Sequence, residues 1–493
     1  MTSTAAPETP EKTTFQYQKR GRWLDHWEPD NEQFWENGGK RTAWKNLIFS
    51  VLSEHLGFNV WVIWTIVVTN MGNAGFAFMQ GLGDKNPQAV SNALLLTSAP
   101  VLIGAALRVP YTFAIPKFGG RAFTAFSAGM LLIPTLGLAF FINRPDTPMA
   151  VFLILAALAG FGGGNFSSSM ANISFFFPEG KKGTALGINA AGGNLGVAVT
   201  QLALPLLITL GTTVLAKDPA GYRLGLTLAA LFWVPFIALA VFSALRYMDS
   251  ITAAKPDGQS YKLAMTNKQT WVMAFLYIGT FGSFIGFSFA FPTLIKANFP
   301  ELKDVGILVA LGNLAFLGAL VGSFTRPFGG WLSDRIGGGA KITLWVFVSM
   351  AVGIACIMAS LELHSFPLYL LSFLALFILT GIGNGSTYRM IPMIFSAETK
   401  KRAEELGMSA EEMTASAKRQ AGAAIGVIGA VGAFGGFLLQ QALRLANTNF
   451  GSMAPAFWGY AVAFLVMAGV TWWYYLRTSF AVQQAPSLAY ASV

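Results

Sequence analysis

Long apolar runs recur along this chain from about Asn46 to Arg477, separated by short polar stretches. A helix of about 20 apolar residues is enough to cross a bilayer core of about 30 Å. Only 11% of the 493 residues are charged, whereas soluble domains carry about 25%. The runs are continuously apolar, unlike the alternating segments of membrane β-barrels. The sequence therefore predicts an all-α membrane protein that crosses the bilayer many times.

The apolar runs predict twelve transmembrane helices, divided six and six by a polar stretch. They are expected near residues 45–72, 88–116, 120–142, 148–176, 183–211, 221–248, 269–297, 304–334, 341–361, 365–397, 417–445 and 453–477. Five segments follow: an N-terminal cytoplasmic segment (1–44), an N-terminal six-helix bundle (45–248), a cytoplasmic linker (249–268), a C-terminal six-helix bundle (269–477) and a cytoplasmic tail (478–493), which we expect to be disordered.

We also predict the structure of two polar segments outside these spans. The insertion at 398–418 is rich in Glu, Lys and Ala and predicts a surface helix. The tryptophan-rich stretch from Trp23 to Asn46 is amphipathic in character, so we expect it to lie against the membrane surface. The single Cys356 lies in an apolar run and is expected to be a small buried hydrophobe.

Lysine and arginine gather in alternate connections between the runs, for example at Lys181 and Lys182 and again from Lys400 to Arg419. Cytoplasmic loops of membrane proteins carry this excess of basic residues, so the bias places those connections and both termini in the cytoplasm. The same topology explains the net charge of +10, and we therefore expect no nucleic-acid partner.

The two sets of six helices are related by an internal repeat. Arg108 precedes the pair Gly119-Gly120 by the same spacing that separates Arg326 from Gly337-Gly338. The segment GTALGINAAGGNLG, from Gly183, aligns without gaps on GAAIGVIGAVGAFG, from Gly422. A duplicated six-helix unit is the architecture of the major facilitator superfamily, and the loop GGWLSDRIG resembles that superfamily's loop motif. We therefore expect this fold, with two pseudo-symmetric six-helix bundles.

Glycines stand four residues apart on the two aligned helices and predict close helix packing. In a membrane, small residues let helix backbones approach and gain packing energy. We expect these glycines to form seams along which the halves slide during a rocking motion: Gly183, Gly187, Gly192 and Gly196 in the first half, and Gly422, Gly426, Gly432 and Gly436 in the second.

Arg108 and Arg326 are charged residues inside predicted spans, at equivalent places in the two halves. An arginine in the bilayer interior costs about 2.5–3.5 kcal/mol on insertion scales, so it is expected to face protein, water or a ligand. Two guanidinium groups without an obvious carboxylate beside them predict an anion site, because their planar forks bind planar oxyanions bidentately. The alternative is that each arginine caps carbonyl groups or pairs with a loop acid.

Aromatic and polar side chains near these arginines are further candidates. Phe161 and Phe281 have glycine neighbours, which leave a ring room to face a cavity, although most phenylalanines in such a chain are core residues. Tyr277 lies one turn before Phe281 and carries a hydroxyl that can hydrogen-bond a ligand. Asn189 interrupts an apolar run, and its repeat partner is Ile428. Asn189 is expected either to contact the substrate or to hydrogen-bond another helix.

The stretch GFGGGNFSSSMANISFFFPEGKKGTALGINAAGGNLGV resembles the nitrate/nitrite porter (NarK-type) family of the major facilitator superfamily. The segments LLLTSAPVLIGAALRVPYTFAIPKFGGRAFTAFSAGMLLIP and LYIGTFGSFIGFS are similar to the same family. The resemblance implies that Arg108 and Arg326 bind the anion, that Phe161 and Phe281 sandwich it, and that Asn189 and Tyr277 hydrogen-bond it. It also implies nitrate/nitrite antiport by rocker-switch alternating access in the bacterial inner membrane. We expect no cofactor, no metal and a monomer in contact with lipid, with nitrate and nitrite as partners.

Glu54 and His55 form a titratable pair inside the first predicted span. Intramembrane acids often belong to proton relays, and histidine titrates near neutral pH, so the pair could couple nitrate uptake to protons. The alternative is a structural pair, either of Glu54 with His55 or of Glu54 with Arg389 in the tenth span. A porter for another small anion and a nitrate-sensing receptor are further alternatives. An enzyme is not expected, because no nucleophile or metal-ligand motif stands in a suitable context.

Overall fold

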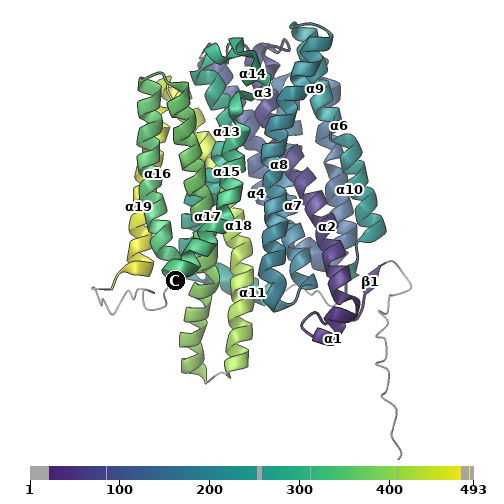
Figure 1. Ribbon diagram of the computed structural model, residues 1–493, viewed down its shortest axis with the longest axis vertical. Coiled ribbons are helices and arrows are strands. Elements are labelled where there is room, and N and C mark those ends of the chain that lie inside the picture. The colour runs from purple at the N-terminus through teal and green to yellow at the C-terminus, as the bar shows by residue number, and fades with distance from the viewer. Residues whose placement is uncertain are drawn as a thin grey trace, which may run out of the picture.

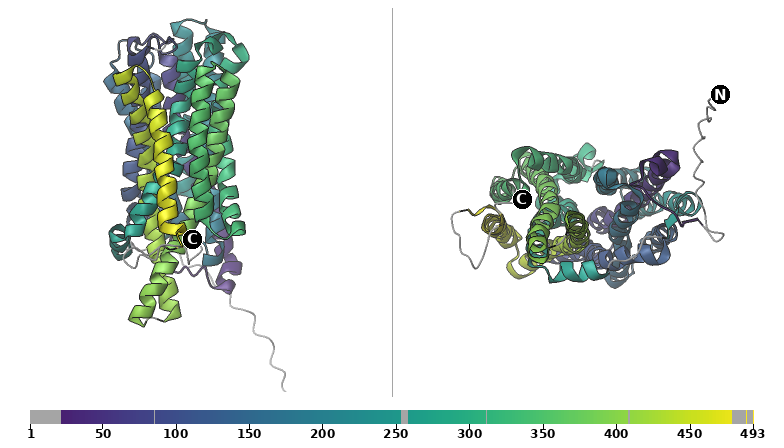
Figure 2. Two further views of the ribbon diagram at one scale, coloured as in Figure 1. Left: turned by 90° about the vertical axis from the view of Figure 1, so that its left-hand side faces the viewer. Right: turned by 90° about the horizontal axis from the view of Figure 1, so that it is seen from below.

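The computed structural model of the chain is a pair of helical bundles that stand side by side (Figure 1). It describes residues 22–84, 86–252, 258–310, 312–407, 409–478, 488 and 493. Figure 2 shows the same two bundles end-on, with the helices of the second half beside those of the first. The expected all-α architecture of two six-helix bundles is confirmed.

The first bundle holds six spans, three of which are divided into two helices. Its elements are α2 (Lys40–Val62), α3 (Trp64–Met71), η2 (Ala77–Met79), α4 (Pro87–Phe118), α5 (Gly120–Met130), α6 (Leu132–Phe141), α7 (Met149–Phe176), α8 (Glu179–Val214), α9 (Pro219–Leu231) and α10 (Val234–Tyr247). Helix α4 begins where the Asn86 side chain accepts from the backbone N–H of Gln88, with Pro87 in the first turn. This cap satisfies a donor that the helix itself leaves free.

The second bundle repeats the arrangement. Its elements are α12 (Lys268–Tyr277), η3 (Ile278–Gly282), α13 (Ser283–Asn298), η4 (Pro300–Asp304), α14 (Gly306–Ala310), η5 (Gly312–Leu314), α15 (Phe316–Ile336), α16 (Gly339–Glu362), α17 (Phe366–Leu406), α18 (Ala410–Phe450), α19 (Ala454–Thr471) and η6 (Trp472–Leu476). Among the described residues, 11 helices are long and apolar enough to cross a membrane. The remaining span is α15, which is less apolar because it carries glycines, serines and Arg326 among its apolar residues.

The eighth span begins later than expected. The prediction placed its start at residue 304, but α15 starts at Phe316 and short helical turns precede it. Gly312 has φ +60 and Asn313 has φ 51. Such left-handed backbone cannot continue a right-handed helix, so the chain must restart after it.

The predicted surface helix at 398–418 is wrong. Helix α17 runs on to Leu406, and α18 starts at Ala410. The polar insertion therefore lengthens two transmembrane helices, which project beyond their neighbours in Figure 1. Ser409 starts α18 through a reciprocal capping box with Glu412, which satisfies backbone donors at the helix start. The expected disordered tail falls almost entirely at 479–487 and 489–492, outside the described residues.

The segment before α2 packs on protein. Strand β1 (Trp23–Leu24) pairs in parallel with β2 (Ser250–Ile251), and α1 (Glu32–Phe34) and η1 (Trp35–Gly39) follow. Leu24 and Trp35 share a buried cluster with Phe176 and Phe177 of the first half. We call the end of the molecule that carries β1, β2 and α11 (Gly258–Thr266) the linker end, and the other the opposite end (Figure 1).

The two halves are joined tightly toward the opposite end. There α4 packs on α18 through a row of polar contacts. Thr97 donates to Gln440 at 2.7 Å, Gln441 donates to Ser98 at 2.6 Å, and Asn447 donates to the Pro87 carbonyl at 2.8 Å. Large apolar side chains cover the outside of the bundles, and Cys356 is exposed there on α16 rather than buried as expected. In a membrane this surface meets lipid, so burial inside the protein is not required for an apolar side chain.

Candidate functional site

Arg108 lies on α4 near the middle of the molecule and is 1% exposed. Its guanidinium carbon is 4.7 Å from the centre of the Phe166 ring and 5.1 Å from that of Phe281. One nitrogen, Nη1, donates to the carbonyl of Gly429 at 3.2 Å. The buried Nε and Nη2 have no hydrogen-bond partner. Since buried donors are almost always paired in proteins, these two mark a place for an acceptor.

Arg326 lies at the matching position of α15 in the second half. Its Nη2 donates to the Tyr277 hydroxyl at 3.4 Å, and its guanidinium carbon lies 5.6 Å from the centre of the Tyr388 ring. The buried Nη1 has no hydrogen-bond partner. Both arginines therefore combine aromatic neighbours with at least one free donor.

The two arginines face the same region. Arg108 interacts electrostatically with Arg326, Tyr277 and Glu54, and Tyr277 interacts with both arginines. No carboxylate of the described residues forms an ion pair with either guanidinium. A buried and a half-buried cation, neither with a paired carboxylate, form a region of positive potential that attracts an anion.

A cavity of about 580 Å³ leads from this region toward the linker end. Arg108, Tyr277 and Tyr388 line its inner part, and Lys182 and Arg419 line its outer part. Its walls come from α4, α7 and α8 of one half and from α17 and α18 of the other. The structure thus has a path between Arg108 and one end of the molecule. Arg326 lies behind Tyr277 and Tyr388 rather than in the cavity lining.

The ring beside Arg108 on α7 is Phe166, whereas the sequence analysis had singled out Phe161. Phe161 packs against Tyr111 and Phe123 and also against the main core. The two phenylalanines are five positions apart on one helix, which places them about 140° apart around its axis. Neither composition nor glycine spacing distinguishes these faces, so the sequence offered no signal for Phe166, nor for Tyr388.

Tyr277 and Phe281 come from α12 and the π-helical turn η3. Their rings stack with centres 5.2 Å apart and planes 18° apart. A Cβ on Gly432 would lie 2.4 Å from the Tyr277 ring, so only glycine leaves room for the phenol there. Single π-helical turns inside α-helices occur often at functional sites. The structure thus brings four of the six predicted binding residues together, namely Arg108, Arg326, Tyr277 and Phe281.

Asn189 is buried on α8, and its side-chain amide donates hydrogen bonds to residues of two other helices. Its Nδ2 donates to Glu54 Oε2 and to Ser169 Oγ, both at 2.6 Å. Its Oδ1 and the Glu54 Oε1 have no partner. A Cβ on Gly193 would lie 2.4 Å from Glu54 Oε1, so this glycine makes room for the carboxyl group. Of the two roles expected for Asn189, the structure therefore shows the interhelical hydrogen bond.

Both expected structural pairs of Glu54 are wrong. His55 Nδ1 lies 2.8 Å from the carbonyl oxygen of Gly192. Arg389 donates from Nε to Asp334 at 2.5 Å, and both side chains of that pair are exposed. The reason is helix rotation, because Glu54 faces α8 while Arg389 lies on the side of α17 that meets α15. Glu54 instead interacts electrostatically with Arg108 and Arg326.

The glycine seams divide into a packed part and an open part. A Cβ on Gly192 would lie 2.5 Å from Val51, and one on Gly436 would lie 2.9 Å from Ile285. Both neighbours belong to the same half as the glycine, so the tight contacts lie within the halves rather than between them as expected. Gly196 and Gly432 are packed in the same way, Gly426 lies beside Tyr261, and Gly183, Gly187 and Gly422 have nothing within 4 Å. Gly183, Gly422 and Gly426 line the cavity instead.

Comparison with known proteins gives consistent results. The family model of the Major Facilitator Superfamily matches residues 47–410. The chain is 38% identical over 474 residues to "Nitrate/nitrite transporter NarU" of Escherichia coli, covering 94% of this chain and 99% of that one. It is 32% identical over 471 residues to "Probable nitrate/nitrite antiporter NarK2" of Thermus thermophilus, covering 93% and 97%. The inward-open xylose transporter XylE from E. coli has a TM-score of 0.62 at 13% identity, covering 90% and 98%, a likeness that shows the fold.

Proposed function

This chain belongs to the nitrate/nitrite transporter family of the major facilitator superfamily, as its motifs predicted, and from this premise we propose that it carries nitrate inward across the bacterial inner membrane in exchange for nitrite. It is a multi-pass membrane transporter and not an enzyme. The Lys and Arg bias of the connections supports a cytoplasmic linker end. We further propose a monomer whose apolar outer surface is covered by lipid.

The observation that carries the proposal is a pair of guanidinium groups, buried at Arg108 and half-buried at Arg326, each with a buried donor that has no partner. Arg108 and Arg326 come from equivalent positions of the two halves, and no described carboxylate is paired with either. Nitrate and nitrite are planar oxyanions that match the fork of donors on a guanidinium. The rings of Phe166 and Phe281 lie at Arg108, and they leave the edge of that guanidinium as the polar surface for the anion.

Exchange rather than one-way transport follows from the charge of the empty site. Arginine stays protonated in proteins, so without a bound anion the site keeps two positive charges, against at most the one carboxyl group of Glu54, while the inward-open and outward-open states interconvert. Buried unpaired charges are costly. An anion bound between the arginines removes most of this cost, and the halves therefore reorient when loaded. Nitrate enters in one direction and nitrite leaves in the other.

Counterflow tests the proposal. Proteoliposomes containing the purified protein are loaded with nitrite, and the entry of isotopically labelled nitrate is measured against vesicles loaded with gluconate. We expect rapid entry only with internal nitrite, and no entry for an Arg326→Gln variant. Equal rates from nitrite-loaded and gluconate-loaded vesicles would overturn exchange, and the absence of any protein-dependent entry would overturn nitrate transport.

Proton-coupled nitrate uptake is the second candidate, and the position of Glu54 favours it. Glu54 is 0% exposed and interacts with both site arginines, so it can act as their internal counter-anion. An incoming nitrate that displaces this interaction would favour protonation of the carboxylate, and the proton would then travel with the anion. His55 has a backbone partner and is not needed for this step.

A pH gradient separates the two candidates. Vesicles without internal nitrite are given an acidic exterior, and labelled nitrate entry is followed in wild type and Glu54→Gln. Symport predicts gradient-driven entry in the wild type that the variant loses while nitrite-driven exchange persists. If the gradient drives no entry into wild-type vesicles, proton symport is excluded.

A further inference from the structure

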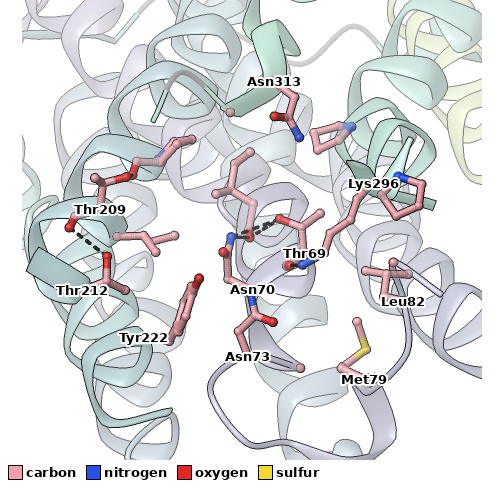
Figure 3. A pocket seen from close by; sticks show the side chains of 18 of the residues that line it. Thr69, Asn70, Asn73, Met79, Leu82, Thr209, Thr212, Tyr222, Lys296 and Asn313 are labelled. Atoms are coloured by element: carbon pink, nitrogen blue, oxygen red, sulfur yellow. Dashed lines mark hydrogen bonds between the residues drawn. The ribbon is translucent and has the colours of Figure 1, made fainter. Parts of the chain in front are cut away.

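A second cavity, of about 760 Å³, lies at the opposite end of the molecule and shares no described lining residue with the first. Its walls come from α3, the loop after it and α8 in the first half, and from α13, η4 and η5 in the second. Figure 3 shows amide and hydroxyl side chains around the space, among them Asn70, Asn73, Thr209 and Asn313. The cavity has room for a hydrated ion.

This cavity is separate from the one that Arg108 lines, and contacts between the halves involve α13, the helix that borders it. The Trp61 and Phe289 rings meet with centres 4.9 Å apart, and Gln201 donates to the Ser288 carbonyl at 2.8 Å. Each contact joins the first half to the second. An anion in the outer cavity therefore occupies a different space from one at Arg108 in this conformation.

Lys296 is the half-buried cation of the outer cavity. It lies in the last turn of α13, where the helix dipole favours positive charge. A lysine that served only this helix end would donate to the last carbonyls of its own helix. Its ammonium instead donates to the backbone carbonyl of Thr69 on α3, in the other half (Figure 3). This bond must break whenever the halves part at the opposite end.

The charge balance of the cavity favours an anion. Its described lining contains two basic residues, Lys217 and Lys296, and one acid, Asp84. Asp84 is exposed and acts electrostatically on Lys296. When the bond to Thr69 is broken, the ammonium faces the opening with only a solvated carboxylate to balance it. A compact ammonium attracts a small hydrated anion under these conditions.

We propose that the outer cavity is a second anion site, in which Lys296 captures a small monovalent anion such as nitrate before it reaches the arginine pair. The inference rests on the proposed function for the identity of the anion. The same ammonium closes this end in one state and receives the anion in the other. Capture and opening are therefore linked, because the carbonyl of Thr69 and the anion compete for one group.

Sided transport tests the site. Right-side-out and inside-out membrane vesicles are loaded with nitrite, and the KM for external nitrate is measured on each side, with vesicle orientation verified by protease access to an N-terminal tag. We expect Lys296→Gln to raise the KM for nitrate about fivefold when the opposite end faces the medium. This is the size of effect that follows from losing the attraction between the anion and one half-exposed positive charge. The KM on the other side should rise by less than this, because there only the loss of the bond to Thr69 acts. Lys296→Arg restores the KM.

Two further variants separate an anion site from a simple latch. Lys217→Gln removes the other positive charge of the same cavity from an exposed residue, and it is expected to raise the KM by less than Lys296→Gln because solvent screens that charge. Asp84→Asn is expected to lower the KM on the opposite side, because it removes a competing negative charge. The inference is overturned if Lys296→Gln and Asp84→Asn shift the KM in the same direction, or if Lys217→Gln matches Lys296→Gln.

Binding to purified protein distinguishes failure of this site from failure of the proposed function. In an Arg108→Gln/Arg326→Gln background, weak nitrate binding should persist and should disappear when Lys296→Gln is added. Chloride in place of gluconate should compete for it. Wild-type exchange with no such residual binding would contradict the outer site alone, whereas residual binding without any wild-type exchange would contradict the proposed function alone.

Discussion

The two halves place the same cation beside different neighbours. In the second half Gly432 makes room for Tyr277, whose hydroxyl contacts Arg326. In the first half the repeat partner of that glycine, Gly193, makes room for Glu54 instead. The repeat thus keeps the arginine and the glycine but exchanges a phenol for a carboxyl group.

A second pair of repeat partners, Asn189 and Ile428, differs in the same way between the halves. Asn189 donates to Glu54, whereas its repeat partner Ile428 is buried. A carboxyl group in an apolar interior needs a donor, and a phenol can be packed by an aliphatic side chain. If the arginines bind the anion as proposed, both halves contribute to that binding, whereas the buried carboxyl group for any proton chemistry lies in the first half.

At the linker end, the two halves place an acidic residue in different surroundings, buried in one case and exposed in the other. The largest effect that we expect is the loss of folding stability when the buried one is removed. Asp249 is buried between Arg22, at 3.2 Å, and Lys45, at 2.7 Å, whereas the Asp334–Arg389 pair of the second half is exposed. We expect Asp249→Asn to cost about 3 kcal/mol of folding stability, because it leaves two cations without their partner. Asp334→Asn should cost less than about 1 kcal/mol. Thermal unfolding of the two purified variants gives the order, and equal losses would contradict it.

Replacing each arginine by lysine compares how much Arg108 and Arg326 contribute to nitrate affinity. Arg108→Lys and Arg326→Lys keep the charge but lose the fork, so each should weaken nitrate binding by about 2 kcal/mol, or about 30-fold. The loss should be larger at Arg108, which has two free donors against one at Arg326. Equilibrium nitrate binding to purified protein is the measurement. Full affinity in Arg108→Lys would refute bidentate binding there.

Alanine in place of Gly193 or Gly432 tests the space that these repeat partners leave for Glu54 and Tyr277. Gly193→Ala should push Glu54 aside and Gly432→Ala should push Tyr277 aside, each at a cost of about 1–3 kcal/mol for overpacking. Gly432→Ala should weaken nitrate binding, since Tyr277 contacts Arg326. Gly193→Ala should strengthen it or leave it unchanged, since it moves a competing carboxyl group. Gly183→Ala is the matched control on the same helix, because a Cβ there meets nothing within 4 Å. Melting temperatures and nitrate affinities of all three variants test this pattern.

The smallest expected effect compares two phenylalanines of α7. Phe166→Ala should weaken nitrate binding by about 1 kcal/mol, or about fivefold, through loss of the ring at Arg108. Phe161→Ala should leave nitrate affinity within about twofold and lower only stability, because its ring packs in the core while Phe166 is the α7 ring at Arg108. The opposite ranking of the two affinities would return Phe161 to the site.

Several features of the site were readable from residue type and spacing. Arg108 and Arg326 stood out because a charge inside an apolar span has few possible surroundings, and their matching positions relative to glycine pairs identified them as equivalents. Tyr277 and Phe281 followed from the family resemblance. By contrast, the partner of Arg389 and the choice between Phe161 and Phe166 depend on the rotation of a helix about its axis. Apolar runs with residues on every face do not reveal that rotation.

The sequence alone determined that this chain is a twelve-span bundle of two repeated halves with one interior arginine in each, because span length, charge and repeats are local properties of the chain. The tertiary structure decided which groups meet. It placed Phe166 over Arg108, the Asn189 amide against Glu54 and the Lys296 ammonium against Thr69 of the other half. Each of these contacts joins separate helices, so it exists only once those helices have packed in a particular rotation and register.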